Sequence, residues 1–201
     1  MAAIDRTIEF VGSFPDPLQR LAPPLPEIAF LGRSNVGKSS LLNAVAGRRL
    51  ARTSATPGKT QHLNVFRFPG FYLIDLPGYG YARHSLVERR RLRALVRETV
   101  ARRRTLAAVV WLLDIRHPVS RDDLEIRELL IEGRREVIVA LTKADKLSRV
   151  RSLEAARGRA RELAVNVDDV VITSATKKSG IEELRDLIDE VVSVQETRED
   201  R

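Results

Sequence analysis

Apolar segments of strand length alternate with amphipathic segments of helix length along nearly the whole chain. This alternation is typical of an α/β domain with a largely parallel sheet. Pro69-Gly70 joins two of the apolar segments so closely that they can only form an antiparallel hairpin. We therefore expect one α/β domain with helices on both faces of a mostly parallel six-stranded sheet, and with this hairpin at the sheet edge. The predicted strands lie near 27–31, 63–68, 71–75, 107–113, 136–141 and 169–173, and the predicted helices near 38–46, 86–103, 121–132, 149–164 and 180–194.

The two ends of the chain depart from this pattern. Residues 1–26 contain five prolines and predict an extended arm that Phe10 and Phe14 hold against the domain. The charged end, 196–201, predicts a flexible tail. The folded domain is therefore expected to span 27–195.

Composition excludes several classes of protein. The 201 residues are 43% hydrophobic and 31% charged, which is ordinary for a single globular domain. There is no cysteine, so disulfides and thiolate metal sites are excluded. The longest apolar stretches, such as 106–113, are far shorter than the ~20 residues of a membrane-spanning helix, and residues 1–6 lack the apolar core of a signal peptide. We expect a cytoplasmic monomer with no membrane span.

Most of the net charge of +8 lies in one segment, which contains the predicted helix 86–103. Between Arg83 and Arg104 there are nine arginines and only two glutamates, a local excess of +7. Arginines neutralise phosphates and release counterions, so this segment could contact RNA or another phosphate-rich partner. The alternative is a solvated face of an amphipathic helix, because apolar residues recur there at helical spacing. Charge alone leaves both interpretations open.

The residues between the first predicted strand and the first predicted helix form a phosphate-binding loop. Their spacing matches G-x-x-x-x-G-K-[ST], which a glycine turn with an accidental lysine would rarely reproduce. The two glycines let the backbone turn its N–H groups toward phosphate oxygens, while Lys38 can reach the β and γ phosphates and Ser39 offers a hydroxyl to Mg²⁺. The loop consists of Gly32, Arg33, Ser34, Asn35, Val36, Gly37, Lys38 and Ser39.

A second motif follows the third predicted strand, where a doubly wound sheet places further ligand-binding loops. It consists of Asp75, Leu76, Pro77 and Gly78. Asp75 can hold Mg²⁺ through a water molecule, and the Gly78 backbone N–H can meet a γ-phosphate. The spacing alone is weak, since a strand-ending turn could carry it. Its position directly after an apolar strand makes the phosphate interpretation the stronger one.

A third motif, after the fifth predicted strand, selects the base. Thr142, Lys143, Ala144 and Asp145 match [NT]-K-x-D, and Thr173, Ser174 and Ala175 after the sixth strand could contact the guanine carbonyl. A carboxylate can accept both the N1–H and the exocyclic amine of guanine, whereas adenine offers neither donor on that edge. Asp145 therefore favours guanine, and Lys143 would lay its aliphatic stem along the ring. Asparagine is commoner than threonine at position 142, so the base contact of Thr142 is the weakest of the set.

Residues 52–62 have the polar, Pro/Gly-punctuated character of a mobile loop. Such a loop can reach the γ-phosphate and complete the magnesium shell with a threonine hydroxyl only while that phosphate is present. On chemistry alone, both Thr56 and Thr60 qualify.

With these elements in order, the chain resembles the small GTPases, and more closely the bacterial EngB (YihA, YsxC) family of the TrmE–Era–EngA group. The resemblance covers about residues 8–195 and implies a P-loop GTPase domain. It also implies a GTP-binding protein that acts in assembly of the large ribosomal subunit and is required for normal septation and cell division. The segments that carry it are 26–30 leading into 32–40, then 56–61, 75–82, 114–117 and 142–145.

The resemblance also assigns roles to single residues. It makes Thr60 the switch threonine that joins Ser39 on Mg²⁺, and it lessens the doubt about Thr142, which this family often carries. It implies that the large ribosomal subunit or its precursor is the partner, which favours rRNA contact by Arg83–Arg104 over DNA. The segment that would close over the nucleotide comprises Gly58, Lys59, Thr60, Gln61 and His62.

Hydrolysis requires an ordered water and positive charge near the γ-phosphate. Lys38, Asn35, Thr60 and Gly78 are the residues expected to serve that step. Tyr79 stands where many GTPases place a water-positioning glutamine, so we expect slow intrinsic turnover. Related GTPases with asparagine at the position of Asn35 use it to hold potassium, which makes K⁺ a candidate second cation.

Two rival functions remain. One is a nucleotide-gated RNA- or ribosome-binding module with negligible turnover. The other is a small-molecule kinase, which the guanine-selective Asp145 and the lack of a recognisable acceptor pocket and lid disfavour.

Overall fold

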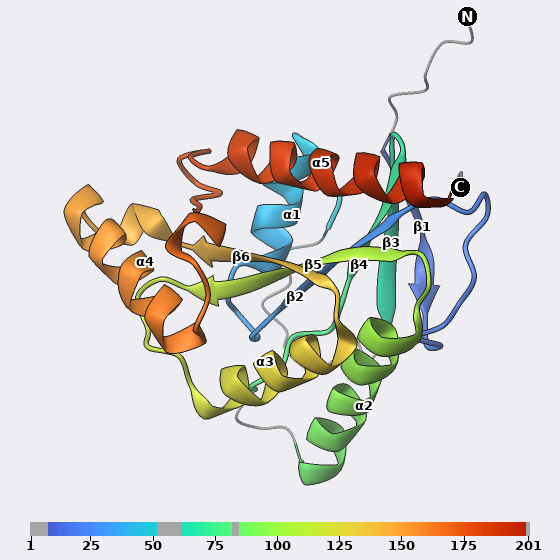
Figure 1. Cartoon of the computed structure of the whole chain (residues 1–201), viewed down its shortest axis with the longest axis horizontal. Helices are drawn as coiled ribbons and strands as arrows, with labels where there is room; N and C mark the ends of the chain where they lie inside the picture. Colours follow the sequence, from blue (N-terminus) through green and yellow to red (C-terminus); the bar gives the residue numbers. More distant parts are fainter. Residues whose placement is uncertain (1–7, 52–61, 82–84, 200–201) are drawn as a thin grey trace, which may run out of the picture.

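The computed structural model describes residues 8–51, 62–81 and 85–199. In this part of the chain, seven strands form one sheet in the order β1-β3-β4-β2-β5-β6-β7, with helices packed on both faces (Figure 1). The strands are β1 (Glu9–Phe14), β2 (Glu27–Gly32), β3 (Leu63–Phe68), β4 (Phe71–Asp75), β5 (Leu106–Asp114), β6 (Glu136–Thr142) and β7 (Val170–Ile172). The helices are α1 (Lys38–Ala46), α2 (Leu86–Arg102), α3 (Arg121–Gly133), α4 (Arg149–Leu163) and α5 (Ile181–Glu199), with short 3₁₀ turns η1 (Ala144–Lys146) and η2 (Val167–Asp169).

The sheet is parallel from β4 to β7 and antiparallel at its other end, where β3 pairs with both β1 and β4. The predicted α/β domain and its hairpin are therefore confirmed. Residues 9–14, expected in an extended arm, add a seventh strand outside that hairpin, so β3 and β4 do not form the edge. The sequence did not reveal β1 because its side chains are mostly exposed and carry no alternating apolar signal.

Two hydrophobic cores cover the two faces of the sheet. One core packs α2, α3 and α4 against the sheet, and the other packs α1 and α5 on the opposite side. The central strands β2 and β5 are buried along nearly their whole length, as a parallel sheet covered on both sides requires. This layering leaves the carboxyl ends of the parallel strands as the place where loops can form a site.

The arm that follows β1 is fixed to the domain by polar contacts. Arg103, directly after α2, forms a buried ion pair with Glu27 and donates hydrogen bonds to the carbonyl oxygens of Pro17 (2.8 Å) and Gln19 (2.9 Å). Tyr72 donates its hydroxyl to the carbonyl oxygen of Pro23 at 3.1 Å. The arm is thus part of the domain's packing.

Phe10 and Phe14 both contact the domain, although Phe10 is largely exposed. The ring of Phe10 lies 5.4 Å from that of Phe66 between centroids, and the partly buried Phe14 packs against the first core. At the other end, α5 continues to Glu199, so residues 196–199 of the predicted tail are helical. Glutamine, glutamate and arginine are good helix formers, which allows the helix to run on without an apolar face.

Two helices begin with a capping box. Ser120 and Asp123 form the box of α3, in which each side chain accepts a hydrogen bond from the other residue's backbone N–H. Ser85 and Glu88 form the box of α2 in the same way. Among the residues that the structure describes, no helix combines the length and apolarity needed to cross a membrane.

Candidate functional site

The phosphate loop lies between the end of β2 and the start of α1, as the motif predicts. Gly37 caps α1 with φ of 104°, a left-handed conformation that glycine adopts without strain. A Cβ on Gly32 would lie 2.9 Å from the Leu112 carbonyl oxygen, so this position also requires glycine. The backbone N–H groups at the start of α1 have no helical partner and carry partial positive charge, which suits a phosphate.

Lys38 and Asp75 meet at the centre of the predicted phosphate site. The Lys38 ammonium forms an ion pair with Asp75 Oδ1, and both side chains are largely buried. Strand β4 pairs with β2 in parallel, with Phe30 opposite Asp75, so the carboxylate lies beside the phosphate loop. The structure therefore brings together two of the motifs that the sequence predicted.

Gly78 lies so close to the loop that a side chain here would require the loop to shift slightly. A Cβ there would lie 3.0 Å from the backbone nitrogen of Ser34, whose hydroxyl donates to the Gly78 carbonyl oxygen at 3.3 Å. The next residue, Tyr79, donates its N–H to the Gly32 carbonyl at 3.2 Å and accepts from the Ser34 N–H at 2.7 Å. These backbone bonds tie the Asp75–Gly78 segment to the phosphate loop.

The side chain of Tyr79 points into the protein interior. Its hydroxyl donates to Asp123 Oδ1 at 2.7 Å and accepts from Trp111 Nε1 at 2.8 Å. Burial, together with the Asp123 charge, raises the pKa of Tyr79 well above its ordinary value. The ring thus occupies a fixed place under α3, and its hydroxyl is already engaged on both sides. The sequence identified the missing glutamine but gave no sign of this internal network.

The guanine-selective motif follows β6. Asp145 accepts a hydrogen bond from the Ser174 hydroxyl at 2.7 Å, which with the nearby Lys146 lowers the pKa of Asp145. The Ala144 N–H donates to the Thr173 carbonyl oxygen at 3.1 Å, so the loops after β6 and β7 are held together. A carboxylate that stays ionised at this point is what recognition of two guanine donors requires.

Thr142 and Lys143 connect this motif to the phosphate loop. The buried Thr142 hydroxyl lies 2.6 Å from the Val36 carbonyl oxygen and 3.2 Å from that of Leu113. The Lys143 ammonium donates to the Asn35 carbonyl oxygen at 2.6 Å. Thr142 therefore has a visible role in joining the two loops, which the sequence could not indicate.

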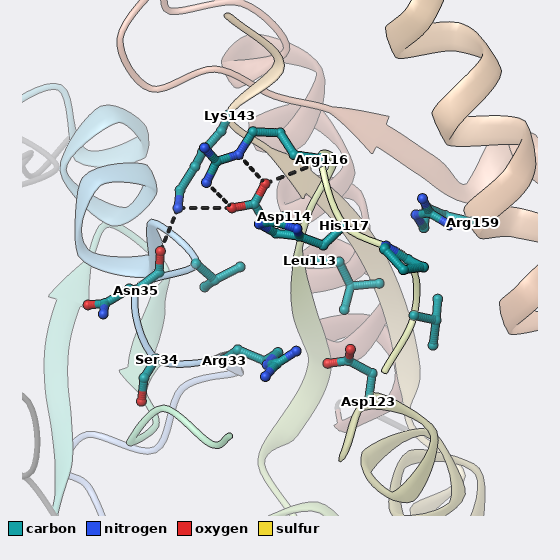
Figure 2. A pocket seen from close by; sticks show the side chains of 13 residues that line it. Arg33, Ser34, Asn35, Leu113, Asp114, Arg116, His117, Asp123, Lys143 and Arg159 are labelled. Carbon is teal, nitrogen blue, oxygen red and sulfur yellow. Dashed lines mark hydrogen bonds and ion pairs between the residues drawn. The ribbon is translucent and has the colours of Figure 1, made fainter. Parts of the chain in front are cut away.

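Asp114, at the end of β5, completes this junction. It forms an ion pair with Lys143 (3.0 Å) and accepts two hydrogen bonds from the Arg116 guanidinium, at 2.9 and 2.7 Å (Figure 2). Partial burial acts to raise the pKa of Asp114, but the hydrogen bonds from Arg116 and Lys143 outweigh it and hold that pKa well below its usual range. Asp114 thus helps to hold the Lys143 ammonium in place beside the phosphate loop. The family segment 114–117 was its only sequence signal.

Part of the predicted site lies outside the described residues. This applies to Thr56 and to Gly58, Lys59, Thr60 and Gln61, which the sequence places around the γ-phosphate. His62 is described and exposed, immediately before β3. The remaining predicted residues gather at the carboxyl ends of β2, β4, β6 and β7.

Comparison with known proteins agrees with this geometry. Residues 27–143 match the family model described as 50S ribosome-binding GTPase. The chain is 44% identical over 168 residues to the probable GTP-binding protein EngB of Heliobacterium modesticaldum, covering 82% of each protein. It is 45% identical over 172 residues to that of Porphyromonas gingivalis, covering 83% of this chain and 86% of the relative.

Solved structures show the same fold. A crystal structure of a probable GTP-binding protein EngB superposes with a TM-score of 0.66 at 24% identity, covering 83% of this chain and 98% of that one. Era bound to MgGDPNP and nucleotides 1506–1542 of 16S ribosomal RNA superposes with a TM-score of 0.68 at 22% identity, covering 84% of this chain and 57% of Era. At such identities these structures support the fold alone. The sequence matches, together with the order of the site loops, show that the chain belongs to the EngB family of GTP-binding proteins.

Proposed function

We propose that this protein is a GTPase switch that acts in assembly of the large ribosomal subunit in the cytoplasm, with an effect on septation and cell division. The observation that carries the nucleotide assignment is Asp145, which Ser174 keeps ionised beside Lys143. In this arrangement, the carboxylate would accept the two guanine donors while the phosphate loop binds the phosphates. Fluorescent GDP and ATP analogues would test it, because ATP binding as tight as GDP binding would contradict the assignment.

The residues fit a bound Mg²⁺. This ion takes few protein ligands and completes its shell with water and phosphate oxygens, so a hydroxyl and one carboxylate suffice. Ser39 would supply the hydroxyl and Asp75 would act through a water, while Thr60 is proposed as the further ligand when GTP is bound. Among the described residues there is no cluster of three or more acidic, histidine or cysteine ligands, so the site depends on the nucleotide. The bound ion would neutralise charge on the β and γ phosphates.

We propose slow intrinsic hydrolysis, because the residue after Gly78 cannot orient a water. The hydroxyl of Tyr79 is committed to Asp123 and Trp111 in the interior. Lys38, Thr60 and the Gly78 N–H would bind the γ-phosphate, and Asn35, which is exposed on the loop, is the candidate ligand for potassium. Equal turnover in K⁺ and Na⁺ would exclude that part of the proposal.

The structure leaves fewer of the clustered arginines free for the proposed contact with ribosomal RNA. Of the nine arginines from Arg83 to Arg104, four form ion pairs that reduce their availability, and Arg83 lies outside the described residues. The exposed pair Arg90 and Arg91 forms no ion pair with any described residue and follows the exposed Leu86 and Val87. The four ion-paired arginines are Arg93 (with Glu125), Arg97 (Glu132), Arg102 (Glu98) and Arg103 (Glu27).

Binding to isolated large subunits would test this surface. Replacing Arg90 and Arg91 by glutamate should abolish GTP-dependent co-sedimentation, whereas the same change at the exposed Arg157 and Arg161 of α4 should leave it intact. If both double variants bind equally, the α2 surface is not the contact. If the unaltered protein binds subunits regardless of GTP or GDP, the switch proposal fails in favour of a constitutive binding module.

A further inference from the structure

A cavity of about 400 Å³ lies between the phosphate loop and the start of α3 (Figure 2), and it shares residues 33–36 and Lys143 with the predicted nucleotide site. Its other walls are residues of the segment from Leu113 to Val119, Asp123 at the start of α3, and Arg159 on α4. The lining contains neither the Lys38–Ser39 pair nor Asp145. A volume of this size is typical of small-molecule sites.

The two carboxylates in the cavity wall are already occupied. Asp114 is bound by Arg116 and Lys143, as described above. Asp123 accepts from the Tyr79 hydroxyl and from both the N–H and the hydroxyl of Ser120, at 2.8 and 2.6 Å. Neither carboxylate is therefore left to attract a cation into the cavity.

Two guanidinium groups in the same wall keep donors available. The Arg33 side chain makes no hydrogen bond or ion pair with any described residue. Arg159 is only 14% exposed and pairs with Glu162, yet its buried Nε–H has no partner in the described structure. In Figure 2 the two side chains extend toward the cavity from opposite sides. A buried donor without an acceptor costs free energy, so an anion here would stabilise Arg159, and the half-buried Arg33 would add a second positive charge.

The position of Arg159 is fixed before any ligand binds. Its partner Glu162 also accepts the backbone N–H of Val119 at 2.9 Å, so one carboxylate joins α4 to the cavity wall. Between the charged groups the lining is apolar, formed by Val36, Leu113, Pro118 and Val119. The wall thus offers cationic ends around an apolar middle.

We propose that this cavity binds a small organic phosphate, with the phosphate between Arg33 and Arg159 and the apolar body against Val119 and Leu113. Guanidinium groups match phosphate oxygens in a two-point geometry that a single ammonium cannot provide. The proposed phosphate position does not use Lys38, Ser39 or Asp145, so binding here does not require GTP hydrolysis.

Phenyl phosphate is a suitable probe, since it combines a dianion with an apolar ring. Calorimetric titration would use the full chain saturated with Mg²⁺ and GDP, so that the phosphate loop is filled. We expect saturable binding of phenyl phosphate, weaker binding of inorganic phosphate and none of benzyl alcohol. Retention of GDP is measured separately, which distinguishes failure of the nucleotide assignment from failure of this site.

Arg159→Gln should weaken phenyl phosphate binding about tenfold, because one charge-assisted hydrogen bond is lost. Arg157→Gln removes an exposed arginine from the same helix and should change it little. Amide chemical-shift mapping on the unaltered protein gives a readout that needs no variant, with the largest shifts expected at Arg33, Val119 and Arg159. Equal weakening by both variants, or shifts confined to other surfaces, would overturn the proposal.

Discussion

Removing the hydroxyl of Tyr79 provides a direct test of the internal network. In Tyr79→Phe, Asp123 loses a charge-assisted hydrogen bond, and the buried Trp111 N–H loses the only acceptor it has among the described residues. The first loss is worth about 1.5–3 kcal/mol and the second about 1–3 kcal/mol. Asp123 keeps both Ser120 donors, so we expect the two losses together to lower the free energy of unfolding by about 3 kcal/mol, near the lower end of their sum.

Denaturant unfolding of the GDP-loaded protein measures this change in the free energy of unfolding. For a chain of 201 residues, the same loss corresponds to a melting temperature lower by roughly 6–12 °C. Tyr72→Phe is a matched control, since that hydroxyl makes one neutral hydrogen bond to a carbonyl oxygen and should cost only about 1 kcal/mol. If both variants lose about 1 kcal/mol or less, the network does not stabilise the fold as argued.

The pH dependence of the same variant gives a second, independent readout. The pKa of Tyr79 is raised in the folded state, so the unfolded chain releases this proton first as pH increases. The stabilising contribution is complete below about pH 10 and declines above it by up to about 1.4 kcal/mol per pH unit. The stability difference between the unaltered protein and Tyr79→Phe should therefore shrink above pH 10. A constant difference across that range would show that the hydroxyl is not buried as described.

Three further changes test other parts of the molecule. Asp145→Asn should weaken GDP binding by at least about a hundredfold and shift the preference toward xanthine nucleotides, since the amide can donate where the carboxylate accepted. Displacement of a fluorescent GDP analogue by GDP and by xanthosine diphosphate measures the two affinities. Asp114→Asn removes the charge that orients Lys143 and should raise the GDP dissociation constant roughly three- to tenfold with little loss of stability, so an unchanged constant in the same assay would refute the positioning role. Glu27→Gln leaves Arg103 buried without its charged partner and should lower the free energy of unfolding, measured with denaturant, by about 3–5 kcal/mol. The double variant Glu27→Gln with Arg103→Met should recover much of that loss.

The features that were predictable from sequence depend on short stretches of chain. The phosphate loop and the base motif are runs of a few residues whose conformation follows from glycine and from the flanking strand and helix. The parallel strands were evident because β2 and β5 are buried on both faces and read as continuous apolar runs. Strand β1 was not, because its pairing with β3 uses backbone hydrogen bonds and leaves most side chains in solvent.

Contacts between residues that are far apart in the sequence could not be predicted, because no local pattern marks them. The Tyr79 hydroxyl meets Asp123, 44 residues away, and the Thr142 hydroxyl meets the Val36 carbonyl, 106 residues away. Neither pair has a local pattern, since each depends on how two loops lie after the sheet has formed. The sequence could therefore name the residue types of the site, while their connections required the fold.

The positive charge counted along the sequence is larger than the positive charge that the folded protein exposes around α2. Along the sequence the segment from Arg83 to Arg104 has a local excess of +7, but α3 contributes Glu125 and Glu132 to pair with Arg93 and Arg97 once α2 and α3 pack. Arg103 is not available at the surface, because it forms a buried ion pair with Glu27 and holds the N-terminal arm. The exposed arginines that form no ion pair with any described residue are Arg90 and Arg91, in the first half of α2, and Arg104, beyond its end. Arg90 and Arg91 lie in the half of α2 that follows the Asp75–Gly78 segment along the chain, so they are better candidates than Arg104 for a contact that depends on the bound nucleotide.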